Sequence, residues 1–498
     1  MSDTTQADPI FRPVMVLMSG RMFGFLAAFF IPVVLARLFD QSDFGSYKQL
    51  FLIHTTLFGL AQLGMAESLY YFLPMEKNRS GAYIVNALLL MGGAGAICAL
   101  VLWWQSDAIA LLLNNVELAQ YIPLVGIYLL LILLGLLLEI VLTVRRQHVG
   151  ASISYAGTDL LRAIFFVVPV LWVADLGWLM AGAVAFASIR LLATLIYLMR
   201  TNDIVLRTDL HHFKRHTAYA LPFGLAGFIE VIQLNIHLYA VAYFFDVATF
   251  AIYAVGCLQV PLIDILMTST SNVMMVNMRQ KLVQQDYRAA LEIWIDAVKK
   301  ISMVLFPLVT LLILVAPALI VLLFGEAYRA SVPVFIVWAA SSVLVCLMTD
   351  GVLRVFAQNR FLILQNILKL AIIVLLIQSF LEGLHLIGAV LVTTMATMVI
   401  KIIAVARVRS LLNATWSEVL PWGSQAGTAL ICGLAALPCV LMINLWQLTG
   451  LLMLLGVSTV FTLSYILLLL WLGPLSGKEK GQLIAWASAP LLRHRTNQ

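Results

Sequence analysis

The chain has 498 residues, of which 62% are hydrophobic and only 11% are charged, and its mean hydropathy is +1.01. Soluble domains carry about 45–50% apolar and about 25% charged residues, so this composition excludes a soluble globular protein. The formal net charge of +6 comes mainly from basic loops, and we predict no nucleic-acid partner.

Apolar runs of about 20 or more residues recur along the chain, and each is long enough to cross a hydrocarbon core of about 30 Å. They predict an all-α polytopic membrane protein with about fourteen transmembrane helices. In chain order these helices cover residues 14–38, 44–73, 81–104, 118–144, 152–173, 176–199, 215–245, 247–277, 297–324, 330–358, 361–381, 385–406, 421–446 and 449–472. Between the eighth and ninth, residues 278–296 are predicted to form a short amphipathic surface helix.

Basic residues collect in alternate connections between these helices. Only Arg37, Lys48 and Arg329 lie on one side, together with several acids. The other side holds Arg12, Lys77, Arg79, Arg145, Arg146, Arg200, Arg207, Lys214, Arg215, Arg279, Lys281, Arg288, Lys299, Lys300, Arg360, Arg407, Arg409, Lys478, Lys480, Arg493 and Arg495. Because basic loops remain in the cytoplasm, both chain termini are predicted to be cytoplasmic.

Metal and cofactor sites are not predicted. The five cysteines lie inside apolar runs without metal or disulfide spacing, which is typical of small buried side chains. His211, His212 and His216 lie together in a loop, but no further ligand follows at a suitable spacing. The external loops are short, so we also predict that the protein is not an enzyme.

A short pattern, F-D-x-x-x-F-x-x-Y, occurs twice, and all four matched pairs are separated by the same number of residues. It comprises Phe39, Asp40, Phe44 and Tyr47, and then Phe245, Asp246, Phe250 and Tyr253. We interpret it as the first external turn of a duplicated six-helix unit, with the aspartate capping a helix and the aromatics at the membrane interface. The expected domains are an N-lobe (1–207), a C-lobe (208–410) and two further helices with a tail (411–498).

Twelve charged residues fall inside the predicted spans. They are Arg21, Arg162, Arg190, Arg354, Lys369, Lys401, Glu67, Glu139, Asp159, Glu230, Asp264 and Asp350. Each costs about 2.5–3.5 kcal/mol at mid-helix, so each is expected to face a partner or a wet cavity. Sequence spacing and depth suggest the pairs Asp159–Arg162, Asp350–Arg354 and Arg21–Glu67.

Two interpretations of these charges stay open. In the first, they are ion pairs that hold helices in register. In the second, cations receive an anionic headgroup, and the candidate substrate-binding residues are Arg21, Arg162, Arg190, Arg354 and Lys369. Glu67, Glu230 and Asp264 are the candidates for a coupling-ion site that takes H⁺ or Na⁺.

Three stretches resemble the polysaccharide-biosynthesis (O-antigen, Wzx-type) flippases of the MATE-like exporter superfamily, called MOP. "SGRMFGFLAAFFIPVVLARLFDQSDFGSY" (19–47) is similar to their first helix and turn, with its R-x-x-G and F-G-x-Y elements. Residues 219–255 are similar to their seventh helix and its turn. "LIVLLFGEAYRASVPVFIVWAASSVL" (319–344) is similar to the stretch that leads into their tenth helix.

The resemblance implies a flippase in a bacterial inner membrane that moves a polyprenyl-diphosphate-linked oligosaccharide to the periplasmic leaflet by alternating access. Arg21 corresponds to the helix-1 arginine of that family's cationic cavity. The implied partners are the lipid-linked glycan, membrane lipids, a coupling ion and other polysaccharide-assembly proteins. The alternatives are a cation-coupled antiporter of amphipathic small molecules and a non-transporting subunit of a polysaccharide export complex.

Overall fold

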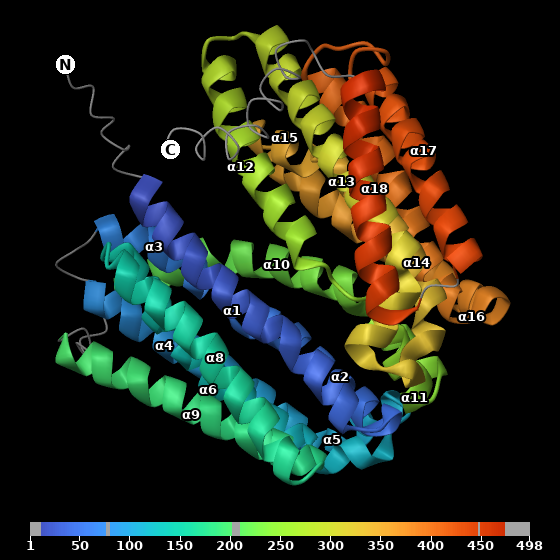
Figure 1. Cartoon of the computed structure of the whole chain (residues 1–498). Helices are drawn as coiled ribbons and strands as arrows, with labels where there is room; N and C mark the ends of the chain where they lie inside the picture. Colours follow the sequence, from blue (N-terminus) through green and yellow to red (C-terminus); the bar gives the residue numbers. More distant parts are fainter. Residues whose placement is uncertain (1–10, 76–79, 202–209, 447–448, 474–498) are drawn as a thin grey trace, which may run out of the picture. The chain divides into compact units, whose positions relative to one another are not determined.

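The computed structural model describes residues 11–75, 80–201, 210–446 and 449–473. Contacts divide the chain into two compact units (Figure 1). Unit 1 contains residues 1–254 and 366–389, and unit 2 contains residues 255–365 and 390–498. The described residues form helices joined by short turns, which confirms the predicted all-α class.

Unit 1 holds the helices of the first half of the chain. They are α1 (Phe11–Leu38), α2 (Gln41–Ala61), α3 (Met65–Met75), α4 (Ser80–Trp104), α5 (Ser106–Leu112), η2 (Val116–Gln120), α6 (Ile122–Gly135), α7 (Leu137–Val144), α8 (His148–Trp172), α9 (Leu176–Arg200), α10 (Leu210–Phe244) and most of α11 (Val247–Gly256). Within it α8 packs against α1 and α9, while α6 packs against α4 and α9.

Unit 2 holds the helices that follow. They are α12 (Pro261–Val283), α13 (Tyr287–Phe324), η3 (Glu326–Ser331), α14 (Val332–Ser341), η4 (Ser342–Leu347), α15 (Thr349–Val355), both ends of α16 (Asn359–Leu411), α17 (Trp422–Trp446) and α18 (Gly450–Leu472). Here α13 packs against α12, α17 and α18. The middle of α16, residues 366–389, belongs to unit 1.

Eleven of the described helices are long and apolar enough to cross a membrane, or twelve if the bent pair α11–α12 forms one span. This finding confirms a polytopic membrane protein. The 53 residues of α16 would extend about 80 Å, more than twice the hydrocarbon thickness, at 1.5 Å per residue. Its backbone is not helical at His385 (φ 49°, ψ −137°), the first residue of the second of the predicted spans 361–381 and 385–406. The total of fourteen stays a prediction.

Several predicted helices are interrupted or extended. The span predicted at 44–73 is divided into α2 and α3 by a turn in which Leu63 and Gly64 have positive φ angles. The separate amphipathic helix predicted at 278–296 is wrong. Its first residues complete α12, a turn follows at Gln284–Asp286, and the remainder is the start of the 38-residue α13. Asp286 caps that start by accepting from the Ala289 N–H at 2.9 Å.

The two copies of the repeated turn have the same local structure. The Asp40 carboxylate accepts from the Asp43 N–H at 2.8 Å and begins α2, and the Asp246 carboxylate accepts from the Thr249 N–H at 3.0 Å and begins α11. The predicted caps are therefore confirmed, because each aspartate accepts from the N–H three residues later at the start of a helix. The two aspartates occupy matching positions of the repeat. The duplicated lobes themselves stay a prediction, and their boundaries differ from those of the contact-defined units.

Most aromatic residues of the repeat are covered by protein, and their predicted place at the membrane interface stays a prediction. Phe44, Tyr47, Phe250 and Tyr253 are all buried. The two copies lie against each other inside unit 1, where a Cβ on Gly45 would overlap the Val247 carbonyl. Side chains near such a close helix approach are covered by neighbouring helices, which explains the burial.

Candidate functional site

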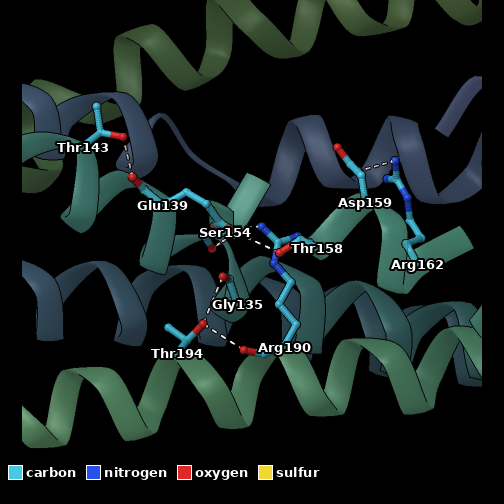
Figure 2. Close-up of polar contacts among 9 residues, drawn as sticks. All are labelled: Gly135, Glu139, Thr143, Ser154, Thr158, Asp159, Arg162, Arg190 and Thr194. Carbon is cyan, nitrogen blue, oxygen red and sulfur yellow. Dashed lines mark hydrogen bonds and ion pairs between the residues drawn. The ribbon is translucent and has the colours of Figure 1, made fainter. Parts of the chain in front are cut away.

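Among the described acids of unit 1, the most deeply buried is Glu139 on α7, whose exposure is 1%. Its carboxylate accepts from the Ser154 hydroxyl at 3.1 Å and the Thr158 hydroxyl at 3.3 Å, both on α8, and from the Arg190 guanidinium of α9 at 3.0 Å (Figure 2). Three partners, one of which carries the opposite charge, offset the desolvation of this carboxylate. Glu139 and Arg190 therefore form an ion pair where α7, α8 and α9 meet.

Arg190 reaches this junction because α6 leaves room for its stem. A Cβ on Gly135 would lie 3.1 Å from the Arg190 Cγ, so a larger residue there would press on the side chain. One turn after Arg190, Thr194 donates to the carbonyls of Arg190 and Gly135, which ties α9 to α6 (Figure 2). Backbone geometry therefore fixes the depth at which the guanidinium lies.

A second pair lies within α8. The Arg162 guanidinium is 2.7 Å from the Asp159 carboxylate, and both side chains are partly exposed, at 32% and 26%. This observation confirms the predicted i,i+3 pair. A Cβ on Gly24 of α1 would overlap the Asp159 carboxylate, so the glycine of the R-x-x-G element is what lets α1 and α8 pack this closely.

Three buried nitrogens near these pairs have no hydrogen-bond partner in the described structure. They are Nε of Arg162, Nε of Arg190 and Nε2 of His54. Arg162 interacts electrostatically with His54 and Tyr128, whose rings lie 4.7 Å apart between centroids. The rings of Phe51 and Phe166 pack against Tyr128 and against each other. We call the set formed by Glu139, Asp159, Arg162, Arg190 and His54 the polar cluster.

The polar cluster contains two arginines and two carboxylates, so its fixed charges balance apart from the histidine. Guanidinium groups stay charged at any physiological pH and can bind phosphate or carboxylate oxygens through two parallel N–H bonds. An incoming anion would therefore use the remaining N–H groups or displace a carboxylate. In the described part of the chain, no group of three His, Cys, Asp or Glu side chains could hold a metal ion.

Of the predicted substrate-binding residues, Arg162 and Arg190 come together in unit 1. Arg21 lies on α1, and its side chain falls outside the described residues, so the predicted Arg21–Glu67 pair is not described either. Lys369, on the part of α16 that belongs to unit 1, interacts electrostatically with His237. Sequence spacing missed Glu139–Arg190 because its two residues are 51 positions apart.

Asp350 and Arg354 do not form the predicted pair. The Asp350 carboxylate is instead 3.3 Å from the Lys401 ammonium and also accepts from Thr349 at 3.1 Å and Gln365 at 3.5 Å. Arg354 is exposed near the end of α15. A lysine and an aspartate inside predicted spans were the only sequence signal for the observed pair, and spacing could not join them.

The predicted ion-coupling residues lie on three helices. Glu67 is exposed on α3 and Glu230 on α10, both in unit 1, and Asp264 is exposed in the first turn of α12 in unit 2. His237, which lies two turns after Glu230 on α10, is buried and was not among the predicted site residues. The His237 ring lies 2.7 Å from the Tyr253 hydroxyl, and both residues are buried.

Comparisons with known proteins agree on the class. A family model described as "Polysaccharide biosynthesis protein" matches residues 34–333. The structure is similar to the lipid II flippase MurJ in an inward closed conformation, with a TM-score of 0.70, 13% identity, and coverage of 92% of this chain and 97% of that one. No curated protein matches the sequence.

Two further solved structures share the fold. An inward-facing multidrug resistance MATE transporter of the MOP superfamily has a TM-score of 0.59 and 16% identity, covering 81% of this chain and 99% of that one. A MOP superfamily transporter from Pyrococcus furiosus has a TM-score of 0.56 and 15% identity, covering 81% and 94%. That transporter is described as having a binding pocket of reverse polarity, which suggests a different function for it. The predicted superfamily fold is thus confirmed.

Proposed function

The chain belongs to the family of polysaccharide biosynthesis proteins, and from this premise we propose that it is a flippase for a lipid-linked oligosaccharide. The substrate is a polyprenyl-diphosphate-linked glycan, which moves from the cytoplasmic to the periplasmic leaflet of a bacterial inner membrane. Movement occurs by alternating access and is coupled to H⁺ or Na⁺. Both chain termini are cytoplasmic in this proposal.

The polar cluster of unit 1 is the observation that supports this proposal best. Four ionised side chains inside membrane-spanning helices oppose insertion by about 2.5–3.5 kcal/mol each before pairing. Two of them are arginines, and each keeps a buried N–H without a partner in the described structure. Arg162 is also partly exposed. These features suit the transient binding of diphosphate oxygens, which need several charge-assisted hydrogen bonds.

The remaining candidates have secondary roles in this proposal. Arg21, Arg354 and Lys369 bind the diphosphate or sugars at other stages of movement. Glu67, Glu230 and Asp264 take up and release the coupling ion, which shifts the balance between two conformations because the ion binds one of them more tightly. Membrane lipids surround the protein, and other polysaccharide-assembly proteins supply and receive its substrate.

A cation-coupled antiporter of amphipathic small molecules is the second candidate. The exposed carboxylates of Glu230 and Asp264, both inside predicted spans, favour it, because a cationic drug prefers an acidic site. A third candidate, which rests on family membership alone, is a non-transporting subunit of a polysaccharide export complex.

Reconstituted vesicles test the proposal. The transbilayer movement of a fluorescent polyprenyl-diphosphate glycan is measured for the wild type, Arg162→Gln, Arg190→Gln and the double variant. Loss of one charge-assisted interaction, about 1.5–3 kcal/mol, predicts movement about ten- to a hundredfold slower if the contact forms in the rate-limiting state. Arg200→Gln, on an exposed arginine at the end of α9, is the matched control.

Wild-type rates in the double variant would contradict the proposed role of the polar cluster. Uptake of a cationic dye in exchange for protons, without glycan movement, would favour the antiporter. Glu230→Gln tests coupling in the same vesicles: we expect movement to continue down a glycan gradient but to lose its dependence on an imposed ion gradient.

A further inference from the structure

A groove on unit 2 is lined by two arginines that do not belong to the polar cluster. It runs along the C-terminal turns of α12 and the end of α15, two helices in contact (Figure 1), and has a volume of about 590 Å³. Its polar side chains are Arg279, Gln280 and Arg354, and Met275, Val276 and Val355 supply apolar surface. We call it the two-arginine groove.

Helix geometry explains why the two guanidinium groups share one groove. Met275 and Arg279 are four residues apart on α12 and therefore lie on the same helix face. Gly351 of α15 lies against this helix, because a Cβ there would be 2.8 Å from the Ser271 hydroxyl oxygen and 2.9 Å from the Met274 methyl group. The glycine allows close packing of the two helices, and Arg354 follows one turn later.

The acid at helical spacing from Arg354 does not neutralise it. Asp350 precedes Arg354 by one turn, the usual spacing for a helical ion pair, but it is engaged with Lys401, Thr349 and Gln365. Both groove arginines are exposed, and none of the residues that line the groove in the described structure is acidic. Two cations thus share a concave surface without a carboxylate.

The two helices that carry the groove are firmly packed against the core of unit 2. Met274, Met278, Val352 and Leu353 are at most 2% exposed and belong to one hydrophobic core with the buried Trp294. Because buried neighbours hold both helices, the arginines extend from a rigid surface and lose little backbone freedom on binding a ligand. A fixed pair of guanidinium groups favours a compact anion with several oxygens, such as a phosphate.

Both arginines lie at helix ends that the charge pattern predicts to be cytoplasmic. Arg279 lies in the last two turns of α12, shortly before Lys281, and Arg354 is one residue from the end of α15. Lipid phosphates occupy this level of the membrane, and anionic lipids attract basic residues there by about 1 kcal/mol each. The neighbouring apolar side chains can contact the first methylene groups of a lipid.

We propose that the two-arginine groove binds the phosphate headgroup of an anionic lipid at the cytoplasmic membrane surface. Arg279 and Arg354 bind the phosphate oxygens, and Gln280 donates an additional hydrogen bond. The headgroup belongs either to a bilayer phospholipid or to a polyprenyl diphosphate. Only in the second case does the inference rest on the proposed function, and the groove is then the place where substrate is collected.

Native mass spectrometry of the detergent-purified full chain tests this site. The probes are phosphatidylglycerol, polyprenyl diphosphate without glycan, and zwitterionic phosphatidylcholine. Arg279→Ala/Arg354→Ala is expected to lower the affinity for both anionic lipids about tenfold or more and to leave that for phosphatidylcholine unchanged. A wild-type preference for the diphosphate, lost in the double variant, identifies the substrate lipid. Equal binding of both anionic lipids, lost in the double variant, shows a site for anionic phosphate headgroups that does not select the substrate lipid.

The controls keep the test decisive. Arg200→Ala removes an exposed arginine from unit 1 and is expected to bind like the wild type. If the double alanine variant does not fold, Arg279→Lys/Arg354→Lys keeps both charges but loses bidentate geometry, and an intermediate loss is expected. Unchanged anionic-lipid binding in a folded double variant contradicts the proposal that the two-arginine groove binds a lipid phosphate. Because no transbilayer movement is measured, that result leaves the Arg162 and Arg190 experiment untouched.

Discussion

Single residues set the electrostatics of this membrane interior. Glu139 shows the principle most clearly, because its buried carboxylate has two hydroxyl partners and a guanidinium. A buried ion pair is weak evidence for stability, since desolvation offsets much of the attraction. Removing one partner nevertheless leaves the other charge buried and unpaired, and this asymmetry makes the pair testable.

We therefore expect Glu139→Gln to lower the free energy of unfolding by about 3–5 kcal/mol, the usual result of breaking a buried pair. Glu139→Leu combined with Arg190→Met should recover most of that loss, because no unpaired charge remains. The thermal unfolding midpoint in detergent measures both variants, and a double-mutant cycle isolates the coupling. Additive effects of the two single substitutions would show that the pair is not coupled in the native state.

Elements are fixed in place by close approaches at small residues and by polar links between loops and helices. Gly64, with a φ of 69°, ends the turn between α2 and α3, and a Cβ there would overlap the Ala220 carbonyl of α10. A side chain at this position would be strained and would also separate the helices. The loop before α17 is linked differently, by Glu418, which accepts from Thr415 and from Arg288 of α13.

The link through Glu418 predicts a pH dependence. Hydrogen bonds from the Thr415 hydroxyl and N–H, and then from Arg288, lower the pKa of Glu418 to about 2. A depressed pKa contributes stability at neutral pH that is lost as the pH falls from about 4.3, the ordinary value, toward 2. Thermal midpoints of the wild type and Glu418→Gln should differ at pH 7 and converge over that window. A constant difference between pH 6 and pH 3 would contradict the link.

At the scale of the whole molecule, hydrophobic composition decides the environment, and the basic loops predict the orientation. The described helices present large apolar side chains outward, including Trp103, Trp104 and Trp172, as a bilayer-embedded protein requires. The positive-inside pattern predicts that the turn between α12 and α13 is cytoplasmic and that the start of α5 is external.

Cysteine labelling tests this orientation. In a chain freed of its five native cysteines, Gln285→Cys should react with a membrane-impermeant maleimide only after the cells are permeabilised. Asp107→Cys should react in spheroplasts without permeabilisation. Both positions are exposed in the structure, so access depends on the side of the membrane. The opposite labelling pattern would reverse the predicted topology.

Local features of the sequence determined the helical membrane class, most of the spans, the two aspartate caps and the Asp159–Arg162 pair. Each depends on residues a few positions apart, whose relative placement follows from helix geometry alone. Close helix approaches also occur at the R-x-x-G element and beside the repeated turn, but the sequence did not predict them.

Tertiary structure alone decided the remaining pairs. Glu139 with Arg190, and Asp350 with Lys401, are each 51 residues apart. Whether such residues meet depends on which helices are neighbours and how each is rotated about its axis, and span prediction supplies neither. The same reason applies to the two-arginine groove, where Gly351 lets α15 pack against α12 and Lys401 engages the acid that spacing had assigned to Arg354.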